Sequence, residues 1–166
     1  MKTNLCFIGL AKRFTDNLCR KLSATFELFY ANVEDLIEFE LIDIQKMEEL
    51  CGKEYLLREE NSVIHRICTY DNTLINIDYK NLNNESNLNT IKDKCLLIYL
   101  RLEKDRFKKE QELENLTLNQ KMIENDLFED RDFICKNISD MTINCTNLTD
   151  EQLIEVIRDE VLNYFI

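Results

Sequence analysis

Five short apolar runs along the chain have the length and composition of buried β-strands. They lie near residues 3–9, 28–31, 73–77, 95–100 and 140–145. The run CLLIYL at 95–100 is the clearest, because an uninterrupted apolar stretch of this length fits a strand that is covered on both faces. We therefore expect a sheet whose strands are buried from both sides.

The segments between these runs place apolar residues three or four positions apart, which is the spacing of an amphipathic helix. They predict helices over 15–28, 33–39, 42–50 and 53–70, a short helix that ends by Lys94, two helical pieces within 103–138, and a helix over 149–165 that opens with a capping box. The inward-facing residues that we expect on three of these helices are Leu18, Cys19, Leu22 and Phe26; Leu56, Leu57, Val63, Ile64, Ile67 and Cys68; and Leu153, Val156, Ile157, Val161 and Tyr164.

The alternation of strands and helices predicts a three-layer α/β fold, in which helices cover both faces of a mostly parallel sheet. No internal repeat, linker or shift in composition divides the chain. A chain of 166 residues is long enough to bury a sizeable core. We interpret residues 1–166 as a single domain.

Charge and composition exclude several classes of function. The formal net charge is −11 and the pI is near 4.6, so the chain lacks the basic surface that binding to nucleic acid or to an anionic membrane requires. No apolar run approaches the length that spans a bilayer, and the start of the chain does not resemble a secretory signal. We expect a cytoplasmic protein.

Cysteine and glycine usage narrow the chemistry further. The seven cysteines are scattered and include no CxxC pair, so we interpret them as small core residues and expect neither disulfides nor a metal site. The chain has two glycines and no proline. Because glycine is the default residue where backbone wraps closely around a phosphate, such a chain has little capacity to form a glycine-rich phosphate loop.

The stretch FIGLAKRFTDNLCRKLS, which begins at Phe7, predicts a buried strand, a turn and an amphipathic helix. It resembles the strand, phosphate loop and first helix of the shikimate kinase family, and Arg20 and Leu22 reproduce the Arg-x-Leu turn of that helix. YANVEDLIE, CLLIYL and RDFICKNISDMTIN resemble later segments of the same family. The resemblance covers nearly all of residues 1–166. It implies a P-loop fold with five parallel strands in the order 2-3-1-4-5, and a kinase that phosphorylates shikimate with ATP and magnesium.

The positions that resemble the phosphate loop keep little of its chemistry. The family pattern G-x-x-G-x-G-K-S/T retains Gly9, but its other glycines fall on Lys12 and Phe14, its lysine on Thr15 and its hydroxyl on Asp16. Thr15 supplies no positive charge, and the carboxylate of Asp16 would repel phosphate by about 4 kcal/mol at 4 Å and an effective dielectric constant of 20. We expect no ATP or magnesium cofactor at this degenerate loop.

The positions that resemble the shikimate site are also changed. The family's paired aspartates fall on Asn32 and Glu34, and its glycine triplet on Asp78, Tyr79 and Lys80. One substrate arginine falls on Leu57; Arg58 follows, but points about 100° away on a helix. Another is kept as Arg131, for which an ion pair within the protein is the favoured interpretation. We interpret these positions as a vestigial substrate site. His65 has no catalytic partner at motif spacing and is interpreted as structural.

The resemblance also allows expectations about geometry. Phe14 should lie over the phosphate position, and the Asp16 carboxylate should accept hydrogen bonds from backbone amides of the first helical turn. Tyr79 or Lys80 should fill the space in which substrate would approach the backbone. These side chains should narrow the cleft at the carboxyl ends of the strands.

Three functions are compatible with the sequence. The leading hypothesis is a pseudokinase of the shikimate kinase family, with no catalytic residues, that acts by binding a protein partner, itself or a small anion. The second is a divergent nucleotide-dependent kinase that uses Lys12, Arg13 and residues of a partner. The third is a purely structural subunit. An open cleft lined by Arg58, Lys80 and Arg131 would favour the binding of a ligand.

Overall fold

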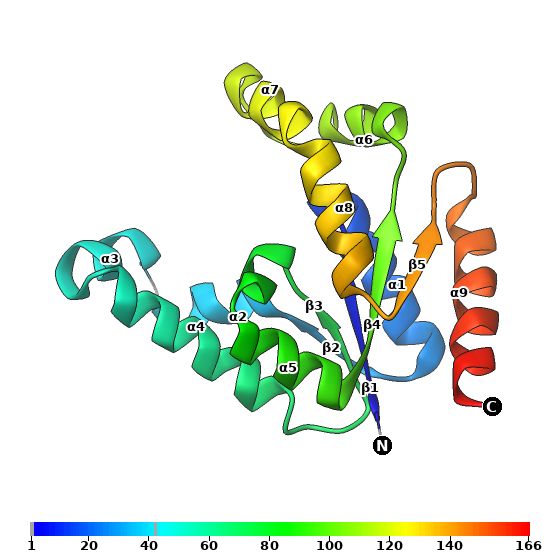
Figure 1. Cartoon of the computed structure of the whole chain (residues 1–166), viewed down its shortest axis with the longest axis horizontal. Helices are drawn as coiled ribbons and strands as arrows, with labels where there is room; N and C mark the ends of the chain where they lie inside the picture. Colours follow the sequence, from blue (N-terminus) through cyan, green and yellow to red (C-terminus); the bar gives the residue numbers. More distant parts are fainter. Residues whose placement is uncertain (1, 42) are drawn as a thin grey trace.

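The computed structural model describes residues 2–41 and 43–166. Its sheet has five strands in the order β2-β3-β1-β4-β5, and all four pairings are parallel (Figure 1). The strands are β1 (Asn4–Ile8), β2 (Phe29–Asn32), β3 (Thr73–Asn76), β4 (Cys95–Arg101) and β5 (Met141–Asn144). The predicted strands, their parallel pairing and their order are confirmed.

Helices connect successive strands. Their bounds are α1 (Lys12–Phe26), α2 (Val33–Leu41), α3 (Ile44–Cys51), α4 (Lys53–Ile67), the 3₁₀ helix η1 (Tyr79–Asn83), α5 (Glu85–Lys94), α6 (Lys104–Gln111), α7 (Leu118–Asp126), α8 (Phe128–Ile138) and α9 (Asp150–Phe165). The two pieces predicted within 103–138 are three helices. The side chain of Thr117 starts α7 by capping its first turn, a local signal that the charged composition of the segment concealed.

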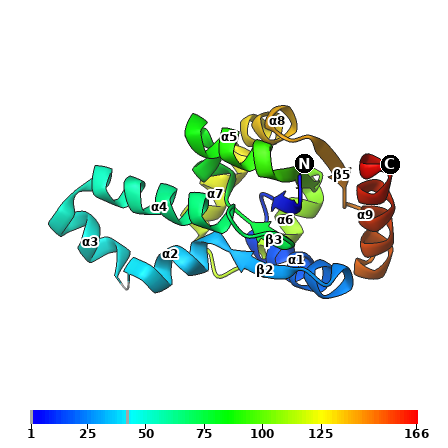
Figure 2. The same ribbon diagram turned by 90° about the horizontal axis from the view of Figure 1, so that it is seen from below.

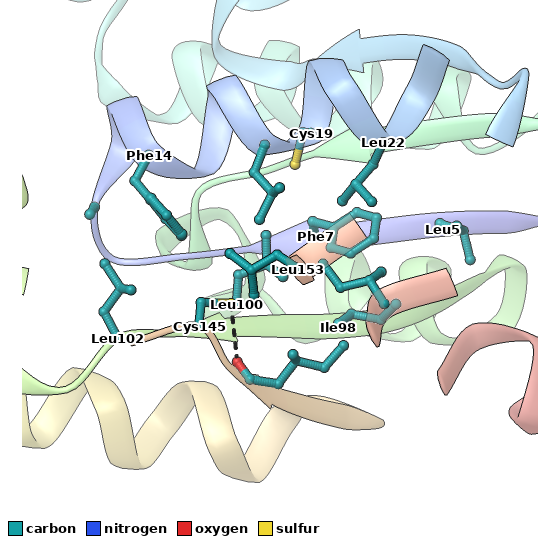
Figure 3. Close-up of a cluster of buried hydrophobic side chains, with 14 of the residues drawn as sticks. Leu5, Phe7, Phe14, Cys19, Leu22, Ile98, Leu100, Leu102, Cys145 and Leu153 are labelled. Carbon is teal, nitrogen blue, oxygen red and sulfur yellow. Dashed lines mark hydrogen bonds between the residues drawn. The ribbon is translucent and has the colours of Figure 1, made fainter. Parts of the chain in front are cut away.

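The sheet separates two hydrophobic cores. Alternate residues of β1 face opposite sides: Leu5 and Phe7 pack with α1 and α9, while Cys6 and Ile8 pack with α2, α4 and α5. Figure 3 shows the first of these cores. Figure 2 shows that α3 and the adjoining part of α4 project from the sheet on the side away from α9. The predicted three-layer fold is confirmed.

Three residues that we expected to face inward are exposed. Leu57 of α4 is 46% exposed, and Val156 and Tyr164 of α9 are 37% and 46% exposed. Their spacing fits an apolar helical face, but α4 projects from the sheet, and α9 packs mainly through Leu153 and two other residues of its buried side. Helical spacing therefore overestimates the buried face where a neighbouring layer covers only part of the helix.

Six of the seven cysteines are buried, and none of the seven forms a disulfide within the part of the chain described. Burial raises the pKa of Cys135 and of Cys145 to about 12, so both are neutral core thiols at physiological pH. Among residues 2–41 and 43–166, no group of His, Cys, Asp or Glu side chains could hold a metal ion. No helix in this part is long and apolar enough to span a membrane.

Candidate functional site

Three adjoining hollows lie at the carboxyl ends of the strands, where ligands bind in open α/β folds. The first, which we call the helix cavity, has a volume of about 220 Å³ and lies at the start of α1, between Gly9, Asp16 and Asn76. The second, the Arg131 cavity, measures about 160 Å³. The third, the cleft, measures about 760 Å³ and extends toward α4 and η1. Lys12 and Asp78 line all three, so these two side chains stand at the centre of the candidate site.

The back wall of the helix cavity is formed by a short loop and the first turns of α1, which pack closely together. Helix α1 begins at Lys12, so only Gly9–Ala11 form a loop after β1. Thr15 is 3% exposed, and its hydroxyl donates to the carbonyl oxygen of Ala11 at 2.9 Å. A Cβ atom at Gly9 would lie 2.0 Å from the Thr15 hydroxyl oxygen. Gly9 is therefore needed for the close contact between the loop and helix α1 at Thr15.

The expectation that Phe14 covers the phosphate position is wrong. Phe14 is buried in the core with Leu18 and Leu22, and Figure 3 shows Phe14 and Leu22 in this core. The reason is the early start of α1: once Lys12 is helical, residues 14, 18 and 22 share the same inward face.

The expectation that Asp16 caps backbone amides is also wrong. Its carboxylate accepts from the Tyr30 hydroxyl at 2.5 Å, from the Asn32 amide at 3.1 Å and from Arg20 Nε at 2.9 Å. Because α1 begins at Lys12, Asp16 is the fifth residue of the helix and lies past the residues whose N–H groups have no partner within the helix. Burial acts to raise the pKa of Asp16, but these three hydrogen bonds outweigh it and lower that pKa, so the carboxylate is ionised and engaged.

Lys12 bridges two carboxylates at the centre of the site. Its ammonium lies 3.0 Å from Glu34 Oε1 and 3.6 Å from Asp78 Oδ2. Desolvation acts to lower the pKa of Lys12, but the hydrogen bond and charge of Glu34, together with the charge of Asp78, raise it overall. Lys12 is therefore charged, and its charge is largely neutralised within the protein.

Asn32 has a local role beside its contact with Asp16. Its side-chain oxygen accepts from the backbone N–H groups of Glu34 and Asp35 at 3.0 and 3.3 Å, which satisfies the start of α2. The oxygen is thus occupied by backbone donors.

The cleft is open, and its wall is rich in amides. Asn61, Asn81, Asn83, Asn84 and Asn87 line it together with carboxylates, lysines and apolar side chains. The amide nitrogen of Asn87 donates to Asn61 Oδ1 at 2.7 Å and to the Asn81 carbonyl at 3.0 Å, which ties α4, η1 and α5 together.

The cationic residues of the predicted substrate site are only partly brought together. Lys80 lines both the cleft and the Arg131 cavity, while Leu57 lines the cleft alone. Arg58 is exposed and lies outside the three hollows. Arg131 is ion-paired with Glu124, and its guanidinium lies 5.7 Å from the centre of the buried Tyr79 ring. The geometry thus fits the ion-pair interpretation of Arg131.

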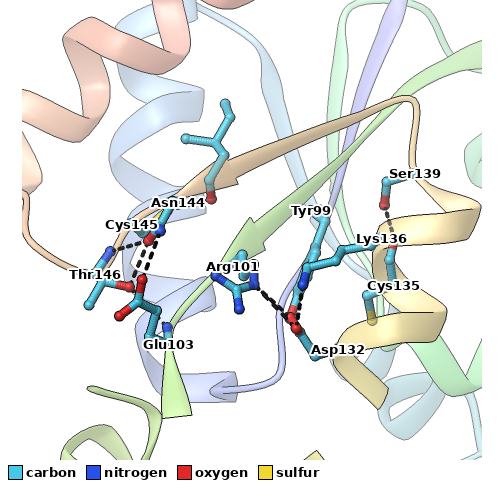
Figure 4. A network of polar contacts seen from close by, with 11 residues as sticks. Tyr99, Arg101, Glu103, Asp132, Cys135, Lys136, Ser139, Asn144, Cys145 and Thr146 are labelled. Atoms are coloured by element: carbon cyan, nitrogen blue, oxygen red, sulfur yellow. Dashed lines mark hydrogen bonds and ion pairs between the residues drawn. The ribbon is translucent and has the colours of Figure 1, made fainter. Parts of the chain in front are cut away.

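A buried network beside β4 was not identified from the sequence. Asp132 of α8 accepts from the Tyr99 hydroxyl at 2.8 Å and from Arg101 Nε at 3.0 Å, and it pairs with Lys136 at 2.7 Å (Figure 4). Burial acts to raise the pKa of Asp132, but the hydrogen bonds from Lys136, Arg101 and Tyr99 lower it overall. The network fastens α8 to the sheet.

A second missed contact closes the start of α1. The backbone N–H of Arg13 donates to Glu114 Oε1 at 3.2 Å, and Arg13 Nη1 donates to the carbonyl of Leu113 at 2.6 Å. Glu114 lies in the turn between α6 and α7, about a hundred residues away in the chain. No spacing in the sequence could have paired these residues, because the contact depends on how α6 returns over the sheet.

His65 also has contacts that the sequence did not suggest. Its ring lies 3.3 Å from the hydroxyl of Ser86 and 3.3 Å from that of Thr90, both on α5. The ring is exposed on α4, and these hydroxyls link the two helices without a carboxylate to complete a catalytic triad.

Comparison with solved structures finds the same arrangement in known kinases. The chain is similar to the shikimate kinase of Acinetobacter baumannii in complex with shikimate, with a TM-score of 0.79 and 16% identity over 99% of this chain and 95% of that one. It is similar to the shikimate kinase of Aquifex aeolicus, with a TM-score of 0.75 and 18% identity over 98% of each chain. It is also similar to the YorR protein of Bacillus subtilis in complex with phosphorylated GDP, with a TM-score of 0.70 and 16% identity over 99% of each chain. No family model and no curated protein matches the sequence. The chain therefore has the fold of shikimate kinases and related P-loop kinases.

Proposed function

We propose that this chain is a pseudokinase that binds a small polar molecule in its cleft and does not transfer phosphate from Mg-ATP. The observation that carries the proposal is the packing of Thr15 against Gly9. A P-loop works through inward-facing backbone N–H groups and a lysine that reaches the phosphates. Here the helix replaces most of the loop, and a buried threonine replaces the lysine.

The polar groups nearby support the same conclusion. The Asp16 carboxylate, at the position of the magnesium-binding hydroxyl in the family pattern, already accepts three hydrogen bonds from side chains. Lys12 is the cation closest to the start of α1, and it is paired with Glu34 and Asp78. Phosphoryl transfer requires positioned cations that neutralise the charge on the phosphates. Because Lys12 is already paired with two carboxylates, it is less available for this role.

The cleft supports retention of a ligand site. Its volume of about 760 Å³ is in the range of small-molecule pockets, and its amide and charged groups can hydrogen-bond to hydroxyls. Leu57 stands where the resemblance places a substrate arginine, and a guanidinium is the group that pairs with a carboxylate. We therefore infer that the cleft takes a polyhydroxylated molecule without an obligatory carboxylate.

Thermal-shift measurements test both parts of the proposal. Mg-ATP at millimolar concentration should leave the melting temperature of the wild type unchanged, whereas a ligand at 100 times its Kd would add about 2.7 kcal/mol to the free energy of unfolding. Leu57→Arg should gain binding of shikimate, because a guanidinium returns to the cleft wall. Leu50→Arg, on the exposed tip of α3, is the matched control. Phosphorylation of shikimate by the wild type would overturn the proposal.

One observation favours a second function, a divergent nucleotide-dependent kinase. Lys12 lines all three hollows, and its ammonium could exchange Glu34 and Asp78 for a phosphate. The similar YorR protein was solved with phosphorylated GDP, which makes guanine nucleotides natural probes. A thermal shift with Mg-GTP or Mg-ATP that disappears in Lys12→Ala would favour this function over the first.

Another observation favours an interaction role, whether with a partner or with a second copy of the chain. Leu118, Met122 and Ile123 of α7 and Leu127 directly after it are 39–77% exposed, and Phe133 of α8 is 67% exposed. Exposed apolar patches of this kind mark interaction surfaces. Light scattering after size exclusion tests self-association: a dimer in the wild type that becomes monomeric in Met122→Lys would support this role.

A further inference from the structure

A polar cavity lies at the amino ends of the strands, at the edge of the sheet opposite to the three hollows. Its volume is about 420 Å³. Thr3, Asp71 and Lys94, which line it, come just before β1, β3 and β4, and Cys68 lines it from the end of α4. Because ligands of open α/β folds bind at the carboxyl ends of the strands, this cavity is separate from the candidate site.

Cys68 is the buried cysteine that this cavity exposes. The residue is 5% exposed, whereas each of the other five buried cysteines is 0% exposed. Its sulfur is therefore within reach of a small solute that enters the cavity.

A second thiol, that of Cys95, lies against Cys68. Cys95 is the first residue of β4, and both cysteines belong to the core that α4 and α5 cover. Cys6 of β1 faces the same core, because β1 and β4 pair Asn4 with Cys95 and Cys6 with Leu97, which makes the two cysteines diagonal neighbours. Three thiols thus gather beside one cavity.

The thiols of Cys68 and Cys95 differ in acidity. A hydrogen bond from the Cys95 S–H lowers the pKa of Cys68, burial opposes this shift, and the positive charge of Lys94 adds to it. The same hydrogen bond, together with burial, raises the pKa of Cys95. Both residues end a helix, where the dipole disfavours a thiolate, so the lower pKa of Cys68 comes from Cys95 and Lys94. The thiolate is the reactive form of cysteine, and Cys68 is therefore the sulfur that reacts first.

The surroundings of Cys68 do not form a Cys–His catalytic pair. His65 lines the same cavity, but its ring contacts the hydroxyls of Ser86 and Thr90 at 3.3 Å and no thiol in the described part of the chain. Cys68 instead combines access from the cavity with a second thiol behind it. This is the arrangement of cysteines that are oxidised reversibly, in which a neighbouring resolving cysteine completes the reaction.

The geometry points to Cys68 and Cys95 as a thiol pair that hydrogen peroxide oxidises to a disulfide. The Cys68 thiolate attacks one oxygen of the peroxide, the O–O bond breaks, and the released hydroxide takes up a proton to become water. Cys68 is then a sulfenic acid. The Cys95 sulfur attacks the Cys68 sulfur, the S–S bond forms as the S–O bond breaks, and the leaving hydroxide takes the Cys95 proton. The pair loses two electrons, and one peroxide becomes two waters. This modification site does not depend on a ligand in the cleft.

Peroxide oxidation of the whole chain, followed by mass spectrometry, tests the inference. The parent protein should carry Cys51→Ser, because the exposed thiol of Cys51 would otherwise react as well. Equimolar peroxide should give a species lighter by two hydrogen atoms, whose peptides join Cys68 to Cys95. This disulfide should form at least about tenfold faster than any oxidation of Cys135 or Cys145, because both of those thiols are neutral.

Three variants of this parent separate the roles of the two sulfurs. In Cys95→Ser, the sulfenic acid on Cys68 should persist and be captured by dimedone, because no sulfur remains to displace its oxygen. Cys68→Ser should give neither the disulfide nor the dimedone adduct. Cys145→Ser, which removes a buried cysteine of the other core, is the matched control and should form the disulfide at the parent rate.

A fourth variant keeps the test available if the core variants do not fold. Lys94→Gln, at an exposed position, should slow disulfide formation by about threefold, because the thiolate fraction of Cys68 falls. Lys92→Gln, on the same helix but outside the cavity lining, should leave the rate unchanged. A disulfide that joins Cys6 to either cysteine, or oxidation of Cys68 no faster than that of Cys135, would overturn the inference.

Discussion

A carboxylate lies among hydrogen-bond donors both at the carboxyl end of β4 and at the start of α1, but the two carboxylates differ in their number of donors and in the direction of their pKa shift. At β4, Asp132 is held by a hydroxyl, a guanidinium and an ammonium, and its pKa is lowered. At α1, Glu114 has one backbone N–H as its hydrogen-bond donor, and its pKa is raised. The charge of Asp132 is thus stabilised by three donor groups, whereas the charge of Glu114 is stabilised by one.

This difference separates structural polar groups from groups that are free to move. A buried carboxylate with several donors is costly to disturb, because each donor would lose its partner. A desolvated carboxylate with few donors gives up little when it leaves. Near Glu114, however, Gly9 and Thr15 are packed so closely that a Cβ atom at Gly9 would lie 2.0 Å from the Thr15 hydroxyl oxygen. The start of α1 thus combines the close packing of Gly9 and Thr15 with a weakly held contact, the hydrogen bond from the Arg13 N–H to Glu114.

The rigid back wall should give the largest effect. Thr15→Lys should lower the free energy of unfolding by about 4 kcal/mol, because the longer side chain overpacks the contact with Gly9 and brings an ammonium into a buried position. Asn17→Lys, at an exposed position of the same helix, should have little effect. Chemical denaturation measures both, and a Thr15→Lys variant as stable as Asn17→Lys would show that the wall is loose.

Breaking the network at β4 should cost nearly as much. Asp132→Asn should lower the free energy of unfolding by about 3 kcal/mol, since it leaves charged partners without a counter-charge. Asp130→Asn, exposed on the same helix, is the control. Because the folded pKa of Asp132 lies below its unfolded value, its contribution is present above a pH of about 4 and is lost as the pH falls through the folded pKa. The difference between wild type and variant should therefore shrink in acid, and an undiminished difference would contradict the assignment.

The two glycines should respond to alanine for different reasons. Gly9→Ala should cost about 2 kcal/mol through its clash with the Thr15 hydroxyl, and Thr15→Ala should restore part of this loss. Gly52→Ala should cost about 1–2 kcal/mol through the backbone alone, because Gly52 has a φ of +84° and a ψ of 163°, while the space that its Cβ would occupy is open. Two outcomes would contradict these separate reasons: Thr15→Ala restores stability to Gly52→Ala, or Thr15→Ala restores no stability to Gly9→Ala.

The smallest effect should come from Glu114, where a substitution should raise the free energy of unfolding and not lower it. Glu114→Gln should be more stable than the wild type at neutral pH by less than about 1 kcal/mol. The groups that face Glu114 are Lys12 and Arg13 of α1, Glu110 of α6 and Glu124 of α7. Because the folded pKa is raised, wild-type stability rises relative to the variant as the pH falls through that value. Thermal unfolding between neutral pH and pH about 4 measures this convergence, and a variant less stable at every pH would refute it.

Local pattern was sufficient for most of the fold. The strands could be predicted because strands covered on both faces need continuous apolar residues, and the order of the strands followed from the resemblance in segment order. The start of α1 could not be predicted, because the resemblance suggested a loop where Phe14, Leu18 and Leu22 continue a helical face. Leu57 and Tyr164 were misplaced because spacing alone does not say how much of a helix the neighbouring layer covers.

The sequence by itself determined which residue types the site holds: Thr15 stands where the resemblance places a lysine, whatever the fold does around it. Only the tertiary structure decided what fills the remaining space. Lys12 meets Glu34 and Asp78, and Glu114 meets Arg13, across long separations in the chain. Such contacts leave no periodic signal, because they join residues that no local rule relates: the convergence of strand ends at one edge of a parallel sheet brings Lys12 to Glu34 and Asp78, and the return of α6 over the sheet brings Glu114 to Arg13.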